Sequence, residues 1–437
     1  MTSGLRTGPS NGAWTKIVGL TRECLSAPSF SVFTMILTGW VLAPGRRTIT
    51  AMIVAGDPEG HRAHDAYHRF FRAASWSTTA LWKVLVTHMV SVLCPPGPLV
   101  LDVDDTLYKK SGRKIDGAGT FRDAVRSTRN KVVHATGLNL VILTLRISPP
   151  WGGMPIGLPV GARLHRKGGP TTLDLAEQVI VELASWLADR SFSLCADGAY
   201  ASLAGRGLPR TTLTSRMRRD AALYAAAPPR TGKRGRPRTK GERLPTPVAM
   251  AQGLSDAAFA KVTVDFRGRV RDLLVWSRPV LWYSVHKVNL VLLAVVRDPE
   301  RVMHDDFFFS TDLEANPAAV ASNYAGRWSI ECVNREVKQC LGAEDPQCWK
   351  HQGPERAASL SLWLYAAIWT WYIPTFGTSA TWIPRPWYPK KATPSFLDAL
   401  AQLRRVLWAE RITPMSSHEP LPAKILDGLL EVLAMAA

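Results

Sequence analysis

Between residues 99 and 201 the hydrophobic pattern changes its period in a definite order. Three apolar, strand-like segments come first: LVLDVDDTLY (99–108), LNLVILTLRI (138–147) and GLPVGARLHR (157–166). A helical pattern then runs from Thr171 to Asp189, and another strand-like segment, FSLCADGAYA, reaches an acid at Asp197. Consecutive strands pair most simply as an antiparallel meander, and the longer period of the next segment is typical of an amphipathic helix. The order predicts an α/β fold built on three strands, a helix and a fourth strand.

A chain of 437 residues is long enough for two or three structural units. Residues 1–95 have apolar helical stretches between Gly and Pro breaks, and Cys94-Pro95-Pro96-Gly97-Pro98 ends this unit. The rest divides into a first part of the α/β core (96–225), a basic linker with a β-rich insertion (226–308), a second part of the core (309–376) and a C-terminal helical region (377–437). We expect strands throughout 260–312, where apolar and polar residues alternate.

The segment Ala357 to Phe376 contains no charged residue and is long enough to cross a bilayer, which takes about 20 apolar residues. A membrane protein is therefore one alternative. Ser359, Ser361, Thr370 and Pro374 interrupt the segment, and a helix that is apolar all round also suits the centre of a large soluble core. The N-terminus lacks the apolar stretch of a secretory signal. These features favour a cytoplasmic protein without a membrane span.

The net charge is +19, from 54 basic and 35 acidic residues. A surface this basic attracts polyanions, so nucleic acid is the first partner to consider and anionic membrane the second. Six cysteines are scattered along the chain, which is typical of reduced thiols. Cys340, Cys348 and His351 are near one another in sequence, but they lack the paired half-sites of a zinc centre, and we favour inert thiols.

The strongest concentration of charge lies between Arg206 and Arg243, with twelve basic and two acidic residues. Within it, KRGRPR resembles the core of an AT-hook, an extended segment that lies in a narrow minor groove. Its candidate DNA-binding residues are Lys233, Arg234, Arg236 and Arg238. The alternative is a solvated basic linker that contacts phosphates without specificity.

A second set of candidate residues lies in the segment Glu314 to Gly342, for which we expect one helix. Tyr324, Arg327, Glu331 and Lys338 follow at steps of three, four and seven, so their side chains fall within an arc of about 60° on that helix. A purely structural helix would place apolar residues on such a stripe. Glu336 is a rival acid, but it lies about 140° around the helix from Glu331, and we expect it to face solvent.

The spacing Tyr-x2-Arg-x3-Glu-x6-Lys resembles the third signature of a large group of bacterial insertion-sequence transposases, the YREK-signature group. The resemblance implies an RNase H-like catalytic core with three acids. The first ends the first core strand, the second ends the fourth, and the third is the Glu of the signature helix. In this chain they are Asp104, with Asp105 as the alternative, then Asp197 and Glu331.

The same resemblance implies metal-dependent cleavage at transposon ends and strand transfer into target DNA. Carboxylate oxygens suit Mg²⁺ or Mn²⁺, and two such ions can stabilise the entering and leaving oxygens of a phosphoryl displacement. Arg327 and Lys338 would hold phosphates and Tyr324 would contact terminal nucleotides, unless the stripe is only a surface ion-pair row. The protein would act as a dimer on DNA, with residues 1–95 as a possible end-binding unit.

Two other enzyme or binding classes remain open. LDVDDTL also fits the loop of haloacid dehalogenase-like phosphatases, with Asp102 as nucleophile, Asp104 as acid/base and His304-Asp305-Asp306 as the later acidic pair. This alternative leaves the Tyr-Arg-Glu-Lys stripe unexplained. A catalytically inactive, transposase-derived DNA-binding protein is the other alternative, although every acid expected for catalysis is present.

Overall fold

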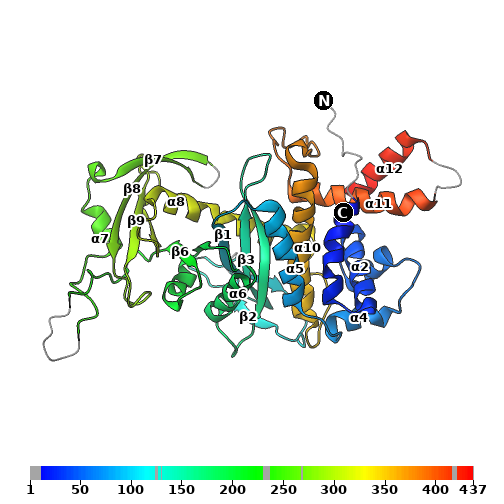
Figure 1. Ribbon diagram of the computed structural model, residues 1–437, viewed down its shortest axis with the longest axis horizontal. Helices are drawn as coiled ribbons and strands as arrows, with labels where there is room; N and C mark the ends of the chain where they lie inside the picture. The colour runs from blue at the N-terminus through cyan, green and yellow to red at the C-terminus, as the bar shows by residue number, and fades with distance from the viewer. Residues whose placement is uncertain are drawn as a thin grey trace.

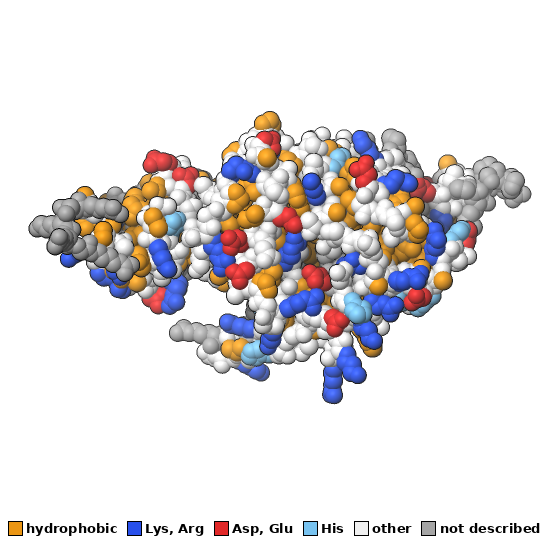
Figure 2. Space-filling model, turned by 60° about the horizontal axis from the view of Figure 1, so that its bottom comes forward, with side chains coloured by type: hydrophobic (Ala, Val, Ile, Leu, Met, Phe, Trp, Pro, Cys, Tyr) orange, Lys and Arg blue, Asp and Glu red, His pale blue; other side chains and the backbone are white. Residues whose placement is uncertain are grey.

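The computed structural model describes residues 11–123, 126–128, 130–229, 237–266, 269–415 and 421–436. The molecule is elongated, as Figure 1 shows, with a β-rich lobe at one end, a central sheet and a helical body at the other end. Lys and Arg side chains are spread along its whole length on the face drawn in Figure 2, with Asp and Glu among them.

The central sheet has the order that the sequence predicts. Strands β1 (Leu99–Lys109), β3 (His134–Ile147) and β4 (Ile156–His165) form an antiparallel meander. Helix α6 (Thr172–Trp186) then leads to β5 (Phe192–Ala196), which pairs in parallel with β1. A further strand that the sequence pattern did not reveal, β6 (Thr211–Arg216), pairs in parallel with β5. The chain is therefore an α/β protein with an RNase H-like core, and the expected fold class is confirmed.

Local sequence explains where helix α6 begins. The Thr171 hydroxyl accepts a hydrogen bond from the Asp174 backbone N–H, and the Asp174 side chain accepts one from the Thr171 backbone. This reciprocal capping satisfies N–H groups that a helix start otherwise leaves unpaired. Short strand β2 (Gly119–Arg122) pairs with the start of β3 and extends that edge of the sheet.

The β-rich insertion continues the central sheet instead of folding as a separate barrel or sandwich. Strand β6 pairs with β10, and the sheet then continues through β9, β8 and β7. Helix α8 covers these strands in Figure 1, and its apolar residues share a second, smaller core with them. The bounds are β7 (Ala260–Phe266), β8 (Arg269–Val280), β9 (Val291–Arg297), β10 (Asp306–Ser310), α7 (Pro247–Gln252) and α8 (Pro317–Gly326).

The helical body is organised around α10 (Gly353–Phe376), which contains the uncharged segment and is buried along most of its length. In Figure 1, α5 and the sheet lie on one side of it, and α2 and α4 lie on the other. In the described part of the chain, no helix combines the length and the hydropathy needed to cross a membrane. The other helices are α1 (Asn11–Gly19), α2 (Ala27–Leu42), α3 (Ile49–Gly56), α4 (His64–Arg72), α5 (Thr78–Leu93), α11 (Phe396–Met415) and α12 (Ala423–Met435). Short 3₁₀ turns span Leu20–Cys24, Asp256–Ala258 and Gly377–Ser379.

Hydrogen bonds from tryptophans join the N-terminal helices to this body. The Trp82 indole donates to the Ser359 hydroxyl (3.0 Å), and the Trp363 indole donates to the Leu81 carbonyl (3.0 Å). The buried Trp40 indole donates to the carbonyl of Leu341 (2.7 Å), the residue that follows helix α9 (Trp328–Cys340). Because these rings belong to one continuous apolar core, residues 11–93 pack as part of the main body.

Arg356 on α10 anchors the chain that connects α4 and α5. Its buried guanidinium donates hydrogen bonds to four backbone carbonyls. The guanidinium carbon also lies over the Trp76 ring, 4.3 Å from the ring centroid. The acceptors are the carbonyls of Phe70, Phe71, Ala74 and Trp76.

We expect Arg356→Leu to lower the free energy of unfolding by about 3 kcal/mol, because it leaves buried carbonyls without donors. The measurement is the midpoint of urea unfolding, with the dependence of the unfolding free energy on urea concentration unchanged. Lys83→Ala, on the exposed face of α5, is the control and leaves the midpoint near that of the wild type. Equal midpoints for Arg356→Leu and wild type would contradict this prediction.

Candidate active site

Strand β1 presents its acids on alternate faces of the sheet. Side chains of a strand alternate, so Asp102, Asp104 and Thr106 share one face and Asp105 points to the other. The shared face is the one against which α9 (Trp328–Cys340) packs. Each of the three is in contact with the signature segment: Asp102 with Ser329 (2.9 Å), Asp104 with Arg327 (2.9 Å) and Thr106 with Lys338 (2.7 Å).

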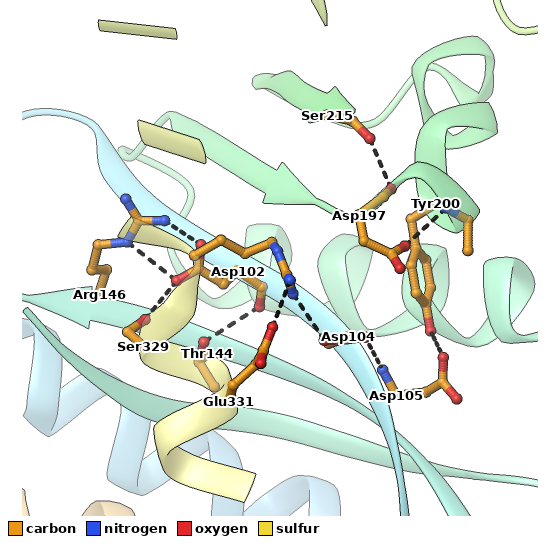
Figure 3. Close-up of polar contacts among 12 residues, drawn as sticks. Asp102, Asp104, Asp105, Thr144, Arg146, Asp197, Tyr200, Ser215, Ser329 and Glu331 are labelled. Carbon is orange, nitrogen blue, oxygen red and sulfur yellow. Dashed lines mark hydrogen bonds and ion pairs between the residues drawn. The ribbon is translucent and has the colours of Figure 1, made fainter. Parts of the chain in front are cut away.

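Asp105 lies on the opposite side, against the 3₁₀ helix η2 (Gly198–Arg206). It accepts a hydrogen bond from the Tyr200 hydroxyl at 3.1 Å, and Figure 3 shows this pair apart from Glu331. The structure therefore brings Asp104, and not Asp105, toward Glu331. The sequence could not separate these two candidates because they are neighbours, but a one-residue step along a strand reverses the face.

The expectation that the first acid ends its strand was wrong. Strand β1 continues to Lys109 because β3 is 14 residues long and pairs with it as far as the Lys109–Gly137 pair. What ends near Asp104 is the other neighbour, since β5 pairs with β1 only as far as Val103 opposite Ala196. Asp104 and Asp197 therefore follow adjacent positions of two parallel strands.

Asp197 is held by the start of the 3₁₀ helix. Its carboxylate accepts a hydrogen bond from the Ala199 N–H (2.8 Å), and its carbonyl accepts one from the Ser215 hydroxyl (2.8 Å; Figure 3). Burial raises the pKa of Asp104 to about 6; Arg327 opposes this shift, whereas the charges of Asp197 and Asp105 add to it. The acids are close enough to repel one another, which favours binding of a cation among them.

The single helix expected for the signature is broken at Arg327. Arg327 lies between α8 and α9, where the Ile330 N–H donates to the Arg327 carbonyl (3.1 Å) in a 3₁₀-like turn. The break has a packing cause, because α8 covers the insertion strands whereas α9 packs on β1 and β4. A Cβ at Gly326 would lie 2.4 Å from Arg146 Nη1, so a larger residue there would displace the Arg146 guanidinium.

The four signature residues still lie near one another, although they span two helices. Arg327 bridges two of the candidate acids, with its guanidinium 2.9 Å from Asp104 Oδ2 and 2.8 Å from Glu331 Oε1. Lys338 donates a hydrogen bond to the Thr106 hydroxyl, two residues beyond Asp104 on β1. Tyr324 packs on the Phe308 ring (4.5 Å between centroids), on the insertion side of the break. Burial alone would lower the pKa of Arg327, but Asp104, Tyr324 and Glu331 outweigh it and raise this pKa.

A buried ion pair that the sequence reasoning missed supports this arrangement. Asp102 is 0% exposed and is paired with Arg146 of β3, while Ser329 of α9 donates to the same carboxylate. Arg146 also donates to the Asn323 carbonyl in α8 (3.0 Å). The network, labelled in part in Figure 3, joins β1, β3 and both signature helices. Arg146, the one charged residue of segment 138–147, was the available signal.

This network argues against the phosphatase alternative. A nucleophilic Asp102 needs access to substrate, but its carboxylate is buried and bonded to Arg146 and Ser329. The proposed later acids are also engaged, because Asp305 pairs with Arg297 and Asp306 pairs with Arg216.

Glu336 does not face solvent, and that expectation was wrong. It accepts a hydrogen bond from the Tyr365 hydroxyl (2.7 Å) of α10, because α9 is covered by the helical body on that side. Burial raises the pKa of Glu336. Of the AT-hook-like residues, Lys233, Arg234 and Arg236 lie outside the described residues, and Arg238 is exposed.

As the side chains stand, the described residues contain no group of three or more His, Cys, Asp or Glu that could hold a metal ion. Cys340, Cys348 and His351, the zinc candidate, do not form such a group. Burial raises the pKa of the Cys348 thiol to about 12. At the acidic site the donor chemistry suits a hard divalent ion, but Arg327 already binds two of the three carboxylates.

Residues 22–271, more than half of the chain, match the family described as DDE superfamily endonuclease. The chain belongs to this superfamily. A search of curated proteins gave no match. The family match includes Asp104 and Asp197 and ends before Glu331, so the third acid is supported by the geometry of α9 alone. As a DDE endonuclease, the chain is a nuclease-type enzyme with DNA as the implied substrate.

We expect Asp102→Ala in this DDE endonuclease to lower the free energy of unfolding by about 3–5 kcal/mol, because it leaves Arg146 as a buried, unpaired charge. The double variant Asp102→Ala/Arg146→Met should recover at least half of that loss. Urea unfolding of both variants measures the difference. A double variant less stable than Asp102→Ala would contradict the ion-pair explanation.

The raised pKa of Glu336 gives a pH prediction. The folded chain keeps this proton at a pH where the unfolded chain has lost it, so wild-type stability falls as pH rises from the ordinary Glu pKa through the folded one. Glu336→Gln keeps an acceptor for Tyr365 and has no proton to lose. Its stability relative to wild type should therefore increase with pH in thermal unfolding, and a pH-independent difference would refute this account.

Proposed function

We propose that this DDE endonuclease is a transposase that cleaves DNA at transposon ends and joins the freed ends to target DNA. The observation that carries the proposal is that Arg327 bridges carboxylates from two distant parts of the chain, Asp104 and Glu331, while Asp197 follows the strand beside β1. Asp104 comes from the middle of β1, Asp197 follows β5, and Glu331 lies in the first turn of α9. This arrangement, together with membership of the superfamily, favours phosphoryl transfer on DNA.

In this proposal Asp104, Asp197 and Glu331 would hold Mg²⁺ or Mn²⁺. Two such ions, when bound, would stabilise the entering and leaving oxygens of the displacement. The chain's own contribution is placement: the parallel pairing of β1 with β5 sets Asp104 beside Asp197, and the buried Asp102–Arg146 pair holds the α8–α9 junction against the sheet. Water is the nucleophile for cleavage, and the resulting 3′ hydroxyl is the nucleophile for joining.

We further propose membership of the YREK-signature group of bacterial insertion-sequence transposases. Lys338 and Tyr324 flank the acids on the α9 and α8 sides respectively, where a cation and a ring suit phosphates and nucleotides near a DNA end. The basic segment with Lys233, Arg234, Arg236 and Arg238 would add non-specific or minor-groove contacts. Pairing of two ends would require a dimer on DNA, in the bacterial cytoplasm at the nucleoid, with residues 1–95 contributing to end binding.

The test is cleavage of a supercoiled plasmid that carries the flanking ends of the element, with Mg²⁺ or with EDTA. Wild type should cut at the ends only with metal, and Glu331→Gln or Asp197→Asn should lose at least about a hundredfold in rate. Asp104→Asn should lose activity and Asp105→Asn should retain it, because only Asp104 faces Glu331.

Glu336→Gln is the matched control, since it removes a carboxylate of the same helix that is bonded to Tyr365. It should cut like the wild type. End binding without cutting by the wild type would replace the proposal with an inactive DNA-binding protein, and cutting by Glu331→Gln would refute the assignment of the third acid.

A further inference from the structure

The Arg327 guanidinium occupies the space between two acids that are proposed metal ligands. One of its nitrogens lies 2.9 Å from Asp104 Oδ2 and the other lies 2.8 Å from Glu331 Oε1. The side chains of Arg327 and Asp104 are 12% and 20% exposed, so solvent screens the contact weakly. The positive charge of Arg327 therefore already balances the negative charge of these carboxylates, before any metal ion is considered.

The contact with Arg327 occupies carboxylate oxygens that a metal ion would need. A divalent ion needs several carboxylate oxygens directed at one point, and the guanidinium takes one oxygen from each of two acids. Asp197 is left beside them, bonded to the start of the 3₁₀ helix. The ion and the guanidinium compete for the same oxygens.

Arg327 is also placed where it can move. It is the junction residue between α8, which packs on the insertion strands, and α9, which packs on the central sheet. Its Nε is buried and has no hydrogen-bond partner among the described residues, so the bridging position leaves this donor unsatisfied there. The Tyr324 ring, with its centroid 5.8 Å from the guanidinium carbon, offers a neighbouring surface on the α8 side.

We infer that Arg327 is the resting counter-ion of the acidic site, that a divalent ion must displace it from Asp104 and Glu331, and that a DNA phosphate promotes this exchange by binding the released guanidinium. The inference rests on the proposed function, since it takes these acids as the metal ligands. A guanidinium forms paired hydrogen bonds with phosphate as readily as with carboxylate. Metal and DNA would then each raise the affinity for the other by the same factor.

The experiment is a Mn²⁺ titration of the full chain without DNA, with free Mn²⁺ followed by electron paramagnetic resonance. Arg327→Gln should bind Mn²⁺ at least about tenfold more tightly than wild type, because no internal cation competes. Arg335→Gln removes the same charge from an exposed position of the same helix, α9, and should change the affinity by less than about twofold. Equal Mn²⁺ affinity in wild type and Arg327→Gln would overturn the inference.

Further variants distinguish a failure of the inference about Arg327 from a failure of the proposed metal site itself. Asp104→Asn in the Arg327→Gln background should abolish the tight binding; Mn²⁺ binding that does not depend on Asp104 in any variant would refute the proposed site. Arg327→Lys, which keeps the charge but cannot bridge both acids, should be intermediate and provides a second measurement if Arg327→Gln does not fold.

DNA is tested by repeating the titration with a short duplex present. The duplex should raise the Mn²⁺ affinity of the wild type and change that of Arg327→Gln much less. An equal increase in both proteins would show that DNA does not act through Arg327.

Discussion

The buried ion pair between Asp102 and Arg146 is the interaction on which the candidate site depends. It joins the first two strands of the meander, and through Ser329 and the Asn323 carbonyl it also holds both helices of the signature segment. Such a pair stabilises a particular arrangement only when its remaining hydrogen bonds are satisfied, as they are here. Two residues further along β1, the same face presents Asp104 to Arg327. The geometry of the acids follows from this anchor.

The sheet also couples the core of the molecule to the insertion. Because β6 pairs with both β5 and β10, the insertion strands extend the catalytic sheet. Helix α8 packs on the insertion strands and α9 packs on the central sheet, and the two helices meet at Arg327, beside the acids. A movement of the insertion lobe would therefore reach Arg327 through α8, which also carries Tyr324.

Much of the fold could be predicted from sequence because it depends on local periodicity. The meander, α6, β5 and the strands within 260–312 follow from alternation and helical period, and the uncharged segment 357–376 proved to be part of a core helix. Strand β6 and the break at Arg327 could not be predicted in this way. The first is short and polar in part, and the second results from packing on two separate sheet regions. Glu336 was misplaced because helical angle alone does not reveal that α10 covers that face.

The sequence by itself determined the chemical inventory: two acids in strand-like segments, and a Tyr-Arg-Glu-Lys spacing that adds a third acid and gathers charge onto one stripe of a predicted helix. The tertiary structure decided which acid faces which, because strand alternation turns Asp104 toward α9 and Asp105 toward Tyr200. It also decided that Arg327, an expected phosphate ligand, bridges Asp104 and Glu331. Spacing along a chain orders residues on one element, whereas distances between β1, β5 and α9 exist only after the sheet has formed and the helices have packed on it.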